Sequence, residues 1–218
     1  VHQAPVAVND VVFFVAYNAS ELLELWRSDG TPGGTYRVKD IYPGGNAAPA
    51  ELAHMNGAVY FRADDGVHGS ELWKSDGTET GTILVKDIYA GGSSAPYYLT
   101  AVGTTLFFVA NDGATGSELW KSNGTVGNAE LVKDINPGYV SSLSQNLVNV
   151  NGTLFFTATD TNGSELWKSN GTASGTVMVA NIAPGSASSY ATVLMNNNGF
   201  LFLKAMDQST RGRELWAY

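Results

Sequence analysis

Short apolar runs recur along this chain at nearly constant distances. The strongest runs combine Val or Leu with aromatic residues, and they are Val12–Phe14, Val59–Phe61, Leu106–Phe108, Leu154–Phe156 and Leu201–Leu203. Runs of this kind, bounded by Asn, Asp and Gly, are typical of β-strands. The pattern therefore predicts an all-β chain built from one repeated unit.

Each strong run is followed by the tripeptide Glu-Leu-Trp, which marks the repeat. The five copies begin at Glu24, Glu71, Glu118, Glu165 and Glu214, with spacings of 47, 47, 47 and 49 residues. A fixed period of this length indicates a solenoid, a propeller or an array.

Within one repeat the pattern predicts four short strands. In the second repeat a weak run at Leu52-Ala53 precedes the strong run, Glu-Leu-Trp follows it, and Val85–Ile88 comes after a hairpin at Asp76-Gly77. Asp-Gly and Asn-Gly pairs accept the positive φ that tight hairpins need. The longest connection leads to the next repeat, as it must when it crosses from an outer strand to the next inner strand. We therefore predict a five-bladed β-propeller of four-stranded antiparallel blades that closes into a ring.

The repeats divide one propeller domain, residues 1–218, into five blades. Their approximate limits are 1–47, 48–94, 95–142, 143–189 and 190–218. The last blade ends just after its Glu-Leu-Trp strand, so it has three strands unless further chain or a neighbouring copy completes it. An open strand edge templates pairing with another chain, which predicts a homo-oligomer through the fifth blade.

Composition and charge narrow the function. The chain has a net charge of −8 and no cysteine. An acidic surface repels phosphate backbones, so we expect no nucleic-acid partner. No apolar run approaches the roughly 18 residues of a membrane helix, which argues against membrane insertion. No nucleophile elbow, phosphate loop or dinucleotide fingerprint occurs, so we expect neither an enzyme nor an organic cofactor.

The motif itself is similar to a known repeat. The segments Glu24–Ile41 and Glu71–Ile88 share Glu-Leu-Trp-x-Ser-Asp-Gly-Thr, a later Gly-Thr and Val-Lys-Asp-Ile. This pattern resembles the bacterial ELWxxDGT repeat family, although Asn123 and Asn170 replace the Asp in later copies. The resemblance implies a secreted or cell-surface bacterial protein. The five-fold layout is also similar to the tachylectin-type five-bladed lectin propellers, which implies sugar binding by analogy.

Two features of the motif have structural explanations. The tryptophans Trp26, Trp73, Trp120, Trp167 and Trp216 offer stacking platforms for sugars, but their regular apolar context favours packing between blades. Glu71 and Lys86 lie 15 residues apart across a hairpin, as do Glu24 with Lys39 and Glu118 with Lys133. This spacing predicts cross-strand ion pairs.

Aromatic residues in and after the long connections are candidate ligand contacts. They are Tyr42, Tyr89, Tyr97, Tyr98, Tyr139 and Tyr190. Rigid rings beside Asn, Ser and Gly suit a glycan, because rings stack on sugar faces and polar groups bind hydroxyls. Capping of the blade junctions is the alternative role.

Acidic residues between the second and third strands of the repeats are candidate calcium ligands. They are Asp64, Asp65, Asp112, Asp160 and Asp207. Oxygen ligands at alternate positions suit calcium. Turn formation explains the same residues without a metal.

These features together predict a non-catalytic extracellular binding or adhesion module. Weak carbohydrate sites at the blade junctions would gain avidity on a multivalent surface. The alternative is a structural or protein-interaction module of a larger surface adhesin or filamentous assembly. The expected partner is accordingly a glycan or a cell-surface protein.

Overall fold

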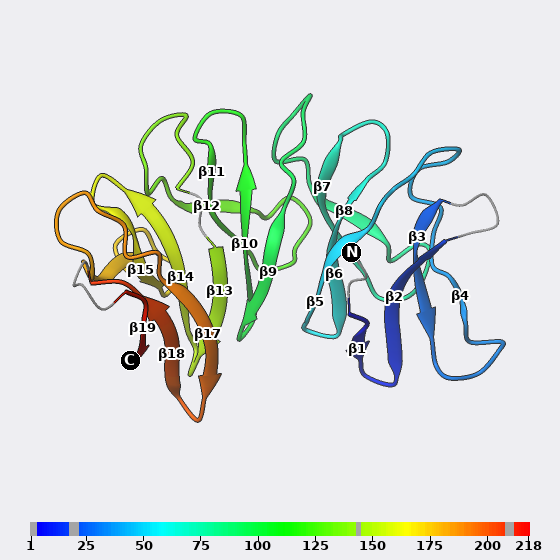
Figure 1. Cartoon of the computed structure of the whole chain (residues 1–218). Coiled ribbons are helices and arrows are strands. Elements are labelled where there is room, and N and C mark those ends of the chain that lie inside the picture. The colour runs from blue at the N-terminus through cyan, green and yellow to red at the C-terminus, as the bar shows by residue number, and fades with distance from the viewer. Residues whose placement is uncertain (1–3, 18–21, 143–144, 208–211) are drawn as a thin grey trace.

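The computed structural model describes residues 4–17, 22–142, 145–207 and 212–218, and it is all-β there (Figure 1). The strands form five antiparallel sheets in chain order. The first sheet has β1 (Val6–Val8), β2 (Val11–Tyr17), β3 (Leu23–Ser28) and β4 (Tyr36–Arg37), and the second has β5 (Ala50–Met55), β6 (Ala58–Asp64), β7 (Ser70–Ser75) and β8 (Ile83–Lys86). The third sheet has β9 (Tyr97–Val102), β10 (Thr105–Asn111), β11 (Ser117–Ser122) and β12 (Glu130–Lys133). The fourth has β13 (Gln145–Val150), β14 (Thr153–Asp160), β15 (Gly163–Ser169) and β16 (Val177–Ala180). The fifth has three strands, β17 (Thr192–Asn197), β18 (Phe200–Ala205) and β19 (Glu214–Ala217). The predicted β-propeller blades, including a three-stranded last blade, are confirmed.

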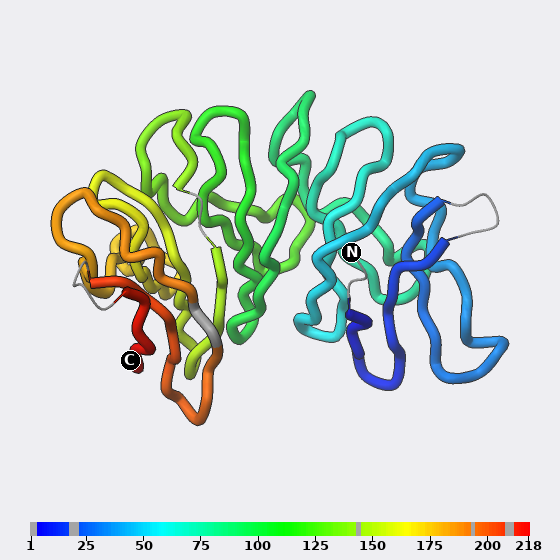
Figure 2. Tube along the Cα trace, viewed as in Figure 1, coloured from blue at the N-terminus to red at the C-terminus, as the bar shows by residue number. Residues whose placement is uncertain are grey.

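The blades stand side by side in an arc. The first strands of successive blades contact one another, β1 with β5, β5 with β9, β9 with β13 and β13 with β17, so they are the innermost strands. The first and fifth blades lie at opposite ends of the arc (Figures 1 and 2). The described structure is therefore an open arc, and the predicted closure into a ring is wrong. Closure requires the rotations at the junctions to add up to a full turn, and side-chain packing sets those rotations.

Each internal blade buries both faces against its neighbours, because strand residues alternate between faces. In β10, Leu106 and Phe108 pack against the second blade, whereas Phe107 and Val109 pack against the fourth. A strand buried on both faces explains why the strongest apolar runs do not alternate with polar residues. Among the described residues no helix has the length and hydrophobicity to cross a membrane.

The exposure of each tryptophan depends on where its blade lies in the arc. Trp73, Trp120 and Trp167 lie buried between neighbouring blades. Trp26 belongs to the first blade and is half-buried. Trp216 is 36% exposed, because no fourth strand covers β19 in the described part of the chain.

The glutamate of the motif fixes the connection to the next blade. Glu71 is fully buried and its Oε2 accepts the Ile88 N–H at 3.0 Å, while its Oε1 accepts the Ser94 N–H at 2.8 Å. The Ser94 hydroxyl donates to the same carboxylate at 2.5 Å. Glu118 and Glu165 repeat these backbone contacts in their own blades. These hydrogen bonds hold the long connections that follow the second, third and fourth blades, and we call each set a glutamate clasp.

The predicted ion pairs between these glutamates and the lysines were wrong. A register shift between Leu72 and Trp73 places Lys86 opposite Leu72. A shift of one residue turns a strand side chain to the other face. Lys86 Nζ instead donates to the Ala129 carbonyl of the next blade at 2.8 Å, and the other two lysines do the same one blade along.

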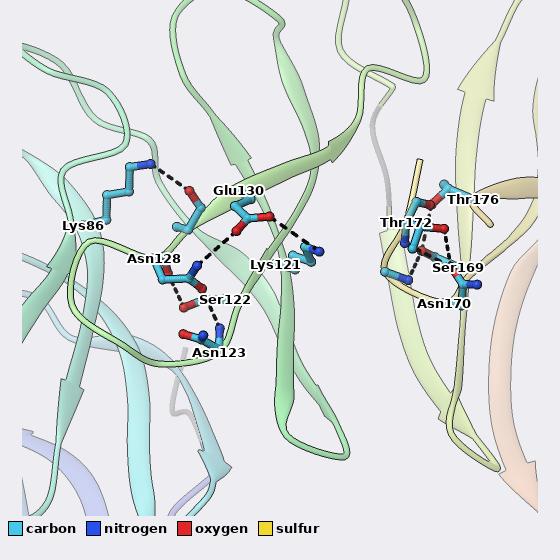
Figure 3. Close-up of polar contacts among 12 residues, drawn as sticks. Lys86, Lys121, Ser122, Asn123, Asn128, Glu130, Ser169, Asn170, Thr172 and Thr176 are labelled. Atoms are coloured by element: carbon cyan, nitrogen blue, oxygen red, sulfur yellow. Dashed lines mark hydrogen bonds and ion pairs between the residues drawn. The ribbon is translucent and has the colours of Figure 1, made fainter. Parts of the chain in front are cut away.

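The rest of the motif closes the hairpin between the third and fourth strands. In the fourth blade Asn170 Oδ1 accepts hydrogen bonds from the Thr172 N–H and hydroxyl, and Thr176 Oγ1 donates to the Thr172 carbonyl (Figure 3). In the third blade Asn128 stands in place of the Gly of the later Gly-Thr and also closes the hairpin, because its Oδ1 accepts the Asn123 N–H at 2.9 Å. Ser-Asp-Gly-Thr and Gly-Thr therefore serve the fold.

Candidate functional site

The long connections and the loops between second and third strands share one face of the arc. A polar side chain in each connection folds back over the start of the third strand of its blade, Asn46 in the first connection and a serine in the other three. Ser93 Oγ accepts the Ser70 N–H at 3.0 Å, Ser141 Oγ accepts the Ser117 N–H at 2.9 Å, and Ser188 Oγ accepts the Ser164 N–H at 3.0 Å. This face therefore presents two sets of loops on a rigid scaffold, where recognition usually takes place.

A cavity of about 390 Å³ lies at the junction of the fourth and fifth blades on this face. We call it the junction cavity. Its lining is almost entirely hydroxyl, amide and aromatic: Gln145, Asn146, Thr157, Thr159, Ser164, Ser188, Tyr190, Ala191, Thr192 and Arg213. Strands β13 to β15, the connection after β16, the start of β17 and the residue before β19 position these side chains. The volume lies within the range of small-molecule sites.

Tyr190 and Arg213 give the junction cavity its chemical character. The Tyr190 side chain is 54% exposed, and the Arg213 guanidinium carbon lies 5.7 Å from the centre of its ring. Tyr190 also adopts a positive φ of 48°, which is uncommon for a bulky residue. An aromatic face with a planar donor beside it suits a ligand that has both a flat apolar surface and hydroxyl or carboxylate oxygens.

The same positions are occupied differently at the earlier junctions. Ala48 and Ala95 take the place of Tyr190 and share its positive φ. The position of Arg213 is held in the second, third and fourth blades by Ser70, Ser117 and Ser164. The fourth–fifth junction therefore combines two substitutions that break the repeat.

The six predicted tyrosines do not form one kind of site. The Tyr42 ring packs against Gly45 and against Gly66 of the next blade, and the Tyr89 ring packs in the same way against two glycines. Both rings therefore fill blade junctions, which is the alternative role predicted for them. The remaining members lie apart, Tyr139 83% exposed in its connection and Tyr97 with Tyr98 on the innermost strand β9.

The acidic loop residues mostly close their own turns. Asp64 and Asp112 accept loop N–H groups at 2.7 to 2.9 Å, and Asp160 accepts the Asn162 N–H. Asp65 also binds His68 Nδ1 at 2.7 Å. Asp207 lies at the end of the fifth blade's described loop. No group of three acidic or histidine side chains suited to a metal occurs among the residues that the structure describes.

The strongest perturbed acids lie away from this cavity. Burial raises the pKa of Glu24 and of Glu118 to about 7, and it also raises the pKa of Glu71. These carboxyl groups are fully buried, and Glu71 and Glu118 bind backbone N–H groups. An acid with such a pKa suits proton transfer only where a substrate can reach it. The arrangement instead offers stacking and hydrogen bonding at the junction cavity.

Of the residues that line the junction cavity, the sequence predicts a ligand contact at Tyr190 alone. It predicts none at Arg213, Gln145, Thr157 or the serines. Arg213 had a signal, because it interrupts a position held by serine in three other repeats. Gln145 and Thr157 had none, since their approach depends on how two blades pack.

Neither a family model nor a curated protein matches the chain. Solved structures do match its fold. A puromycin hydrolase matches with a TM-score of 0.54 and 11% identity, covering 94% of this chain and 34% of its own. A prolyl endopeptidase matches with a TM-score of 0.56 and 16% identity, covering 99% and 35%. Prolyl oligopeptidase B from Galerina marginata matches with a TM-score of 0.55 and 11% identity, covering 98% and 33%.

The chain therefore spans about a third of the length of these neighbours. At such low identity the likeness supports the β-propeller fold alone.

Proposed function

We propose that this chain is a non-catalytic binding module that recognises a glycan in the junction cavity. The observation that carries the proposal is the exposed Tyr190 ring beside Arg213 in a cavity lined by hydroxyl and amide groups. The ring offers a face for a sugar, and the polar lining offers partners for its hydroxyls. Arg213 adds a preference for an acidic substituent, because guanidinium binds carboxylates in a bidentate way.

The setting proposed for this activity is extracellular. This setting rests on the resemblance of the motif to the bacterial ELWxxDGT repeat, which implies a secreted or cell-surface protein. A single shallow polar site gives modest affinity. Several copies on one surface would raise the avidity for a multivalent glycan.

A glycan array with the purified chain tests the proposal directly. We expect binding to at least one glycan class, with acidic sugars preferred. Tyr190→Ala and Arg213→Ser install the residues that earlier repeats carry at the same positions, so each should fold and weaken binding at least tenfold. Tyr139→Ala removes an exposed tyrosine outside the cavity and should bind like the parent chain.

Two results would contradict this function. One is an array on which no glycan is bound. The other is a bound glycan whose affinity is the same for the parent chain, Tyr190→Ala and Arg213→Ser, because that ligand would lie elsewhere.

A second candidate function is a structural or protein-interaction module, and one observation favours it. The Leu of Glu-Leu-Trp is at most 2% exposed in the first four blades, whereas Leu215 in the fifth is 66% exposed. This apolar surface supports docking of another blade or protein. Sedimentation of the chain separates the two candidates, since glycan recognition does not require self-association.

A further inference from the structure

A second cavity, of about 330 Å³, lies on the innermost strands of the second, third and fourth blades. We call it the inner cavity. It is lined by Glu51, Leu52, Tyr98, Leu99, Thr100, Asn146, Leu147 and Val148. These residues come from β5, β9 and β13, which lie side by side along the inside of the arc (Figure 1). Apart from Asn146, which borders both, the inner and junction cavities have no lining residue in common.

The lining of the inner cavity has two parts: a floor of leucines that is the same in each blade, and a rim of polar residues that differs between blades. Leucines occupy one repeat position on each strand, at Leu52, Leu99 and Leu147. The position just before each leucine carries Glu51, Tyr98 or Asn146. Packing of identical blades explains the leucines. It does not explain three different polar side chains at one repeat position.

The backbone at these three rim positions is unusual. Glu51, Tyr98 and Asn146 have φ values of 61°, 57° and 54°. Each sits at a register shift between the first and second strands of its blade. Asn tolerates such a φ, but Glu and Tyr rarely adopt it. Side chains kept at unfavourable backbone positions are common where a binding site needs them.

The electrostatics of the inner cavity select the ligand. Glu51 is the sole charged residue of the lining, within the part of the chain that is described. Its Oε2 accepts the Tyr98 backbone N–H at 2.7 Å, which fixes the carboxylate, and the exposed Tyr98 side chain lines the same cavity. The net charge of −8 adds a field that favours cations. A carboxylate next to an aromatic ring is a suitable receptor for an ammonium group.

We propose that the inner cavity binds a small organic cation, a primary ammonium carried on a compact ring. The ammonium would contact the Glu51 carboxylate and the Tyr98 ring, and the ring of the ligand would rest on the three leucines. This site is separate from the glycan site, so either proposal can fail without the other.

Amide chemical shifts in an NMR titration test this site, with benzylamine as the probe and benzyl alcohol as its neutral counterpart. Benzylamine should bind with a Kd on the order of millimolar, as its few heavy atoms allow. The shifts should lie on β5, β9 and β13. Benzyl alcohol should bind at least tenfold more weakly, because it lacks the charge.

Two variants locate the charge and the ring. Glu51→Gln keeps an oxygen for the Tyr98 N–H and removes the charge, so benzylamine should bind it no better than benzyl alcohol binds the parent. Tyr98→Asn keeps a residue that tolerates the positive φ and removes the ring, and it should weaken benzylamine severalfold. Glu79→Gln, which neutralises an exposed glutamate of a hairpin loop, is the matched control and should leave binding unchanged.

The proposal is overturned by equal affinities for the amine and the alcohol, or by unchanged binding to Glu51→Gln. Shifts centred on Tyr190, or no saturable shift at all, would overturn it as well. Thermal melts of each variant verify that a loss of binding is not a loss of fold.

Discussion

The first blade lacks a serine that completes the glutamate clasp elsewhere, and restoring it should stabilise the protein. In the second blade the Ser94 hydroxyl donates to Glu71 at 2.5 Å. The corresponding residue in the first blade is Ala47, which is buried. Glu24 is also fully buried, and the Ile41 N–H is the backbone donor near its carboxylate. We therefore expect Ala47→Ser to supply a further donor to a buried carboxylate that lacks the serine hydroxyl.

The size of the effect follows from the pKa of Glu24. Burial raises this pKa from 4.5 to about 7. Between these two pH values the folded state binds more protons than the unfolded state, so the free energy of unfolding falls as the pH rises. One pKa unit corresponds to about 1.4 kcal/mol, so ionised Glu24 lowers stability by up to about 3 kcal/mol above pH 7.

A hydrogen bond to a charged group contributes about 1.5 to 3 kcal/mol. Ala47→Ser should therefore raise the free energy of unfolding by about that amount at pH 8. The gain should be smaller at pH 5, where Glu24 is largely protonated in the folded state. The pH dependence of stability should become shallower as a result.

Urea unfolding followed by tryptophan fluorescence at pH 5, 6.5 and 8 measures this effect. The matched control is Ala90→Ser, which adds a hydroxyl to an exposed position of the next connection and should change nothing. A gain that is the same at pH 5 and pH 8 would refute the reasoning, because it would not depend on the charge of Glu24. So would a loss of stability at pH 8.

Two further predictions concern the blade junctions. Trp120→Ala should lower the free energy of unfolding by about 3 to 5 kcal/mol, the usual cost of truncating a buried aromatic. Trp216→Ala, at a partly exposed position, should lower it by under about 1 kcal/mol. Equal losses in urea melts would contradict the assignment of Trp120 to the core. The outer edge of β19 has no strand beside it in the described chain. The protein should therefore self-associate, or its melting temperature should rise when a Val-Lys-Asp-Ile strand is appended. A monodisperse monomer in sedimentation, with an unchanged melting temperature after extension, would argue against this.

Much of the fold could be predicted from the sequence, because each strand carries its own local signal. The spacing of Glu-Leu-Trp gave the number of blades, and the Asp-Gly and Asn-Gly pairs marked the hairpins. The partner of the glutamate could not be predicted in this way. A register shift beside Leu72 moves Lys86 off the expected position, and such a shift leaves no mark in the spacing of residues.

The open arc and the two cavities depend on relations between blades. The rotation at a junction comes from the packing of side chains such as Phe108 and Tyr60, which no single repeat encodes. The cavities lie where the repeat is broken, at Arg213 and at the series Glu51, Tyr98 and Asn146. Comparing equivalent positions across the repeats would have pointed to these residues, whereas searching for motifs favours the residues that stay the same.

An open row of blades also has a mechanical consequence. Among the described strands, the main contacts between blades join blades that are neighbours in sequence. The position of the fifth blade relative to the first is therefore the sum of the rotations at the junctions between them. Small rotations in the same sense add along the arc, and they displace its two ends far more than any single junction moves. A ligand that bridges β5, β9 and β13 would hold three blades at fixed angles. It would reduce the bending of the whole arc and so limit how far the first and fifth blades move apart.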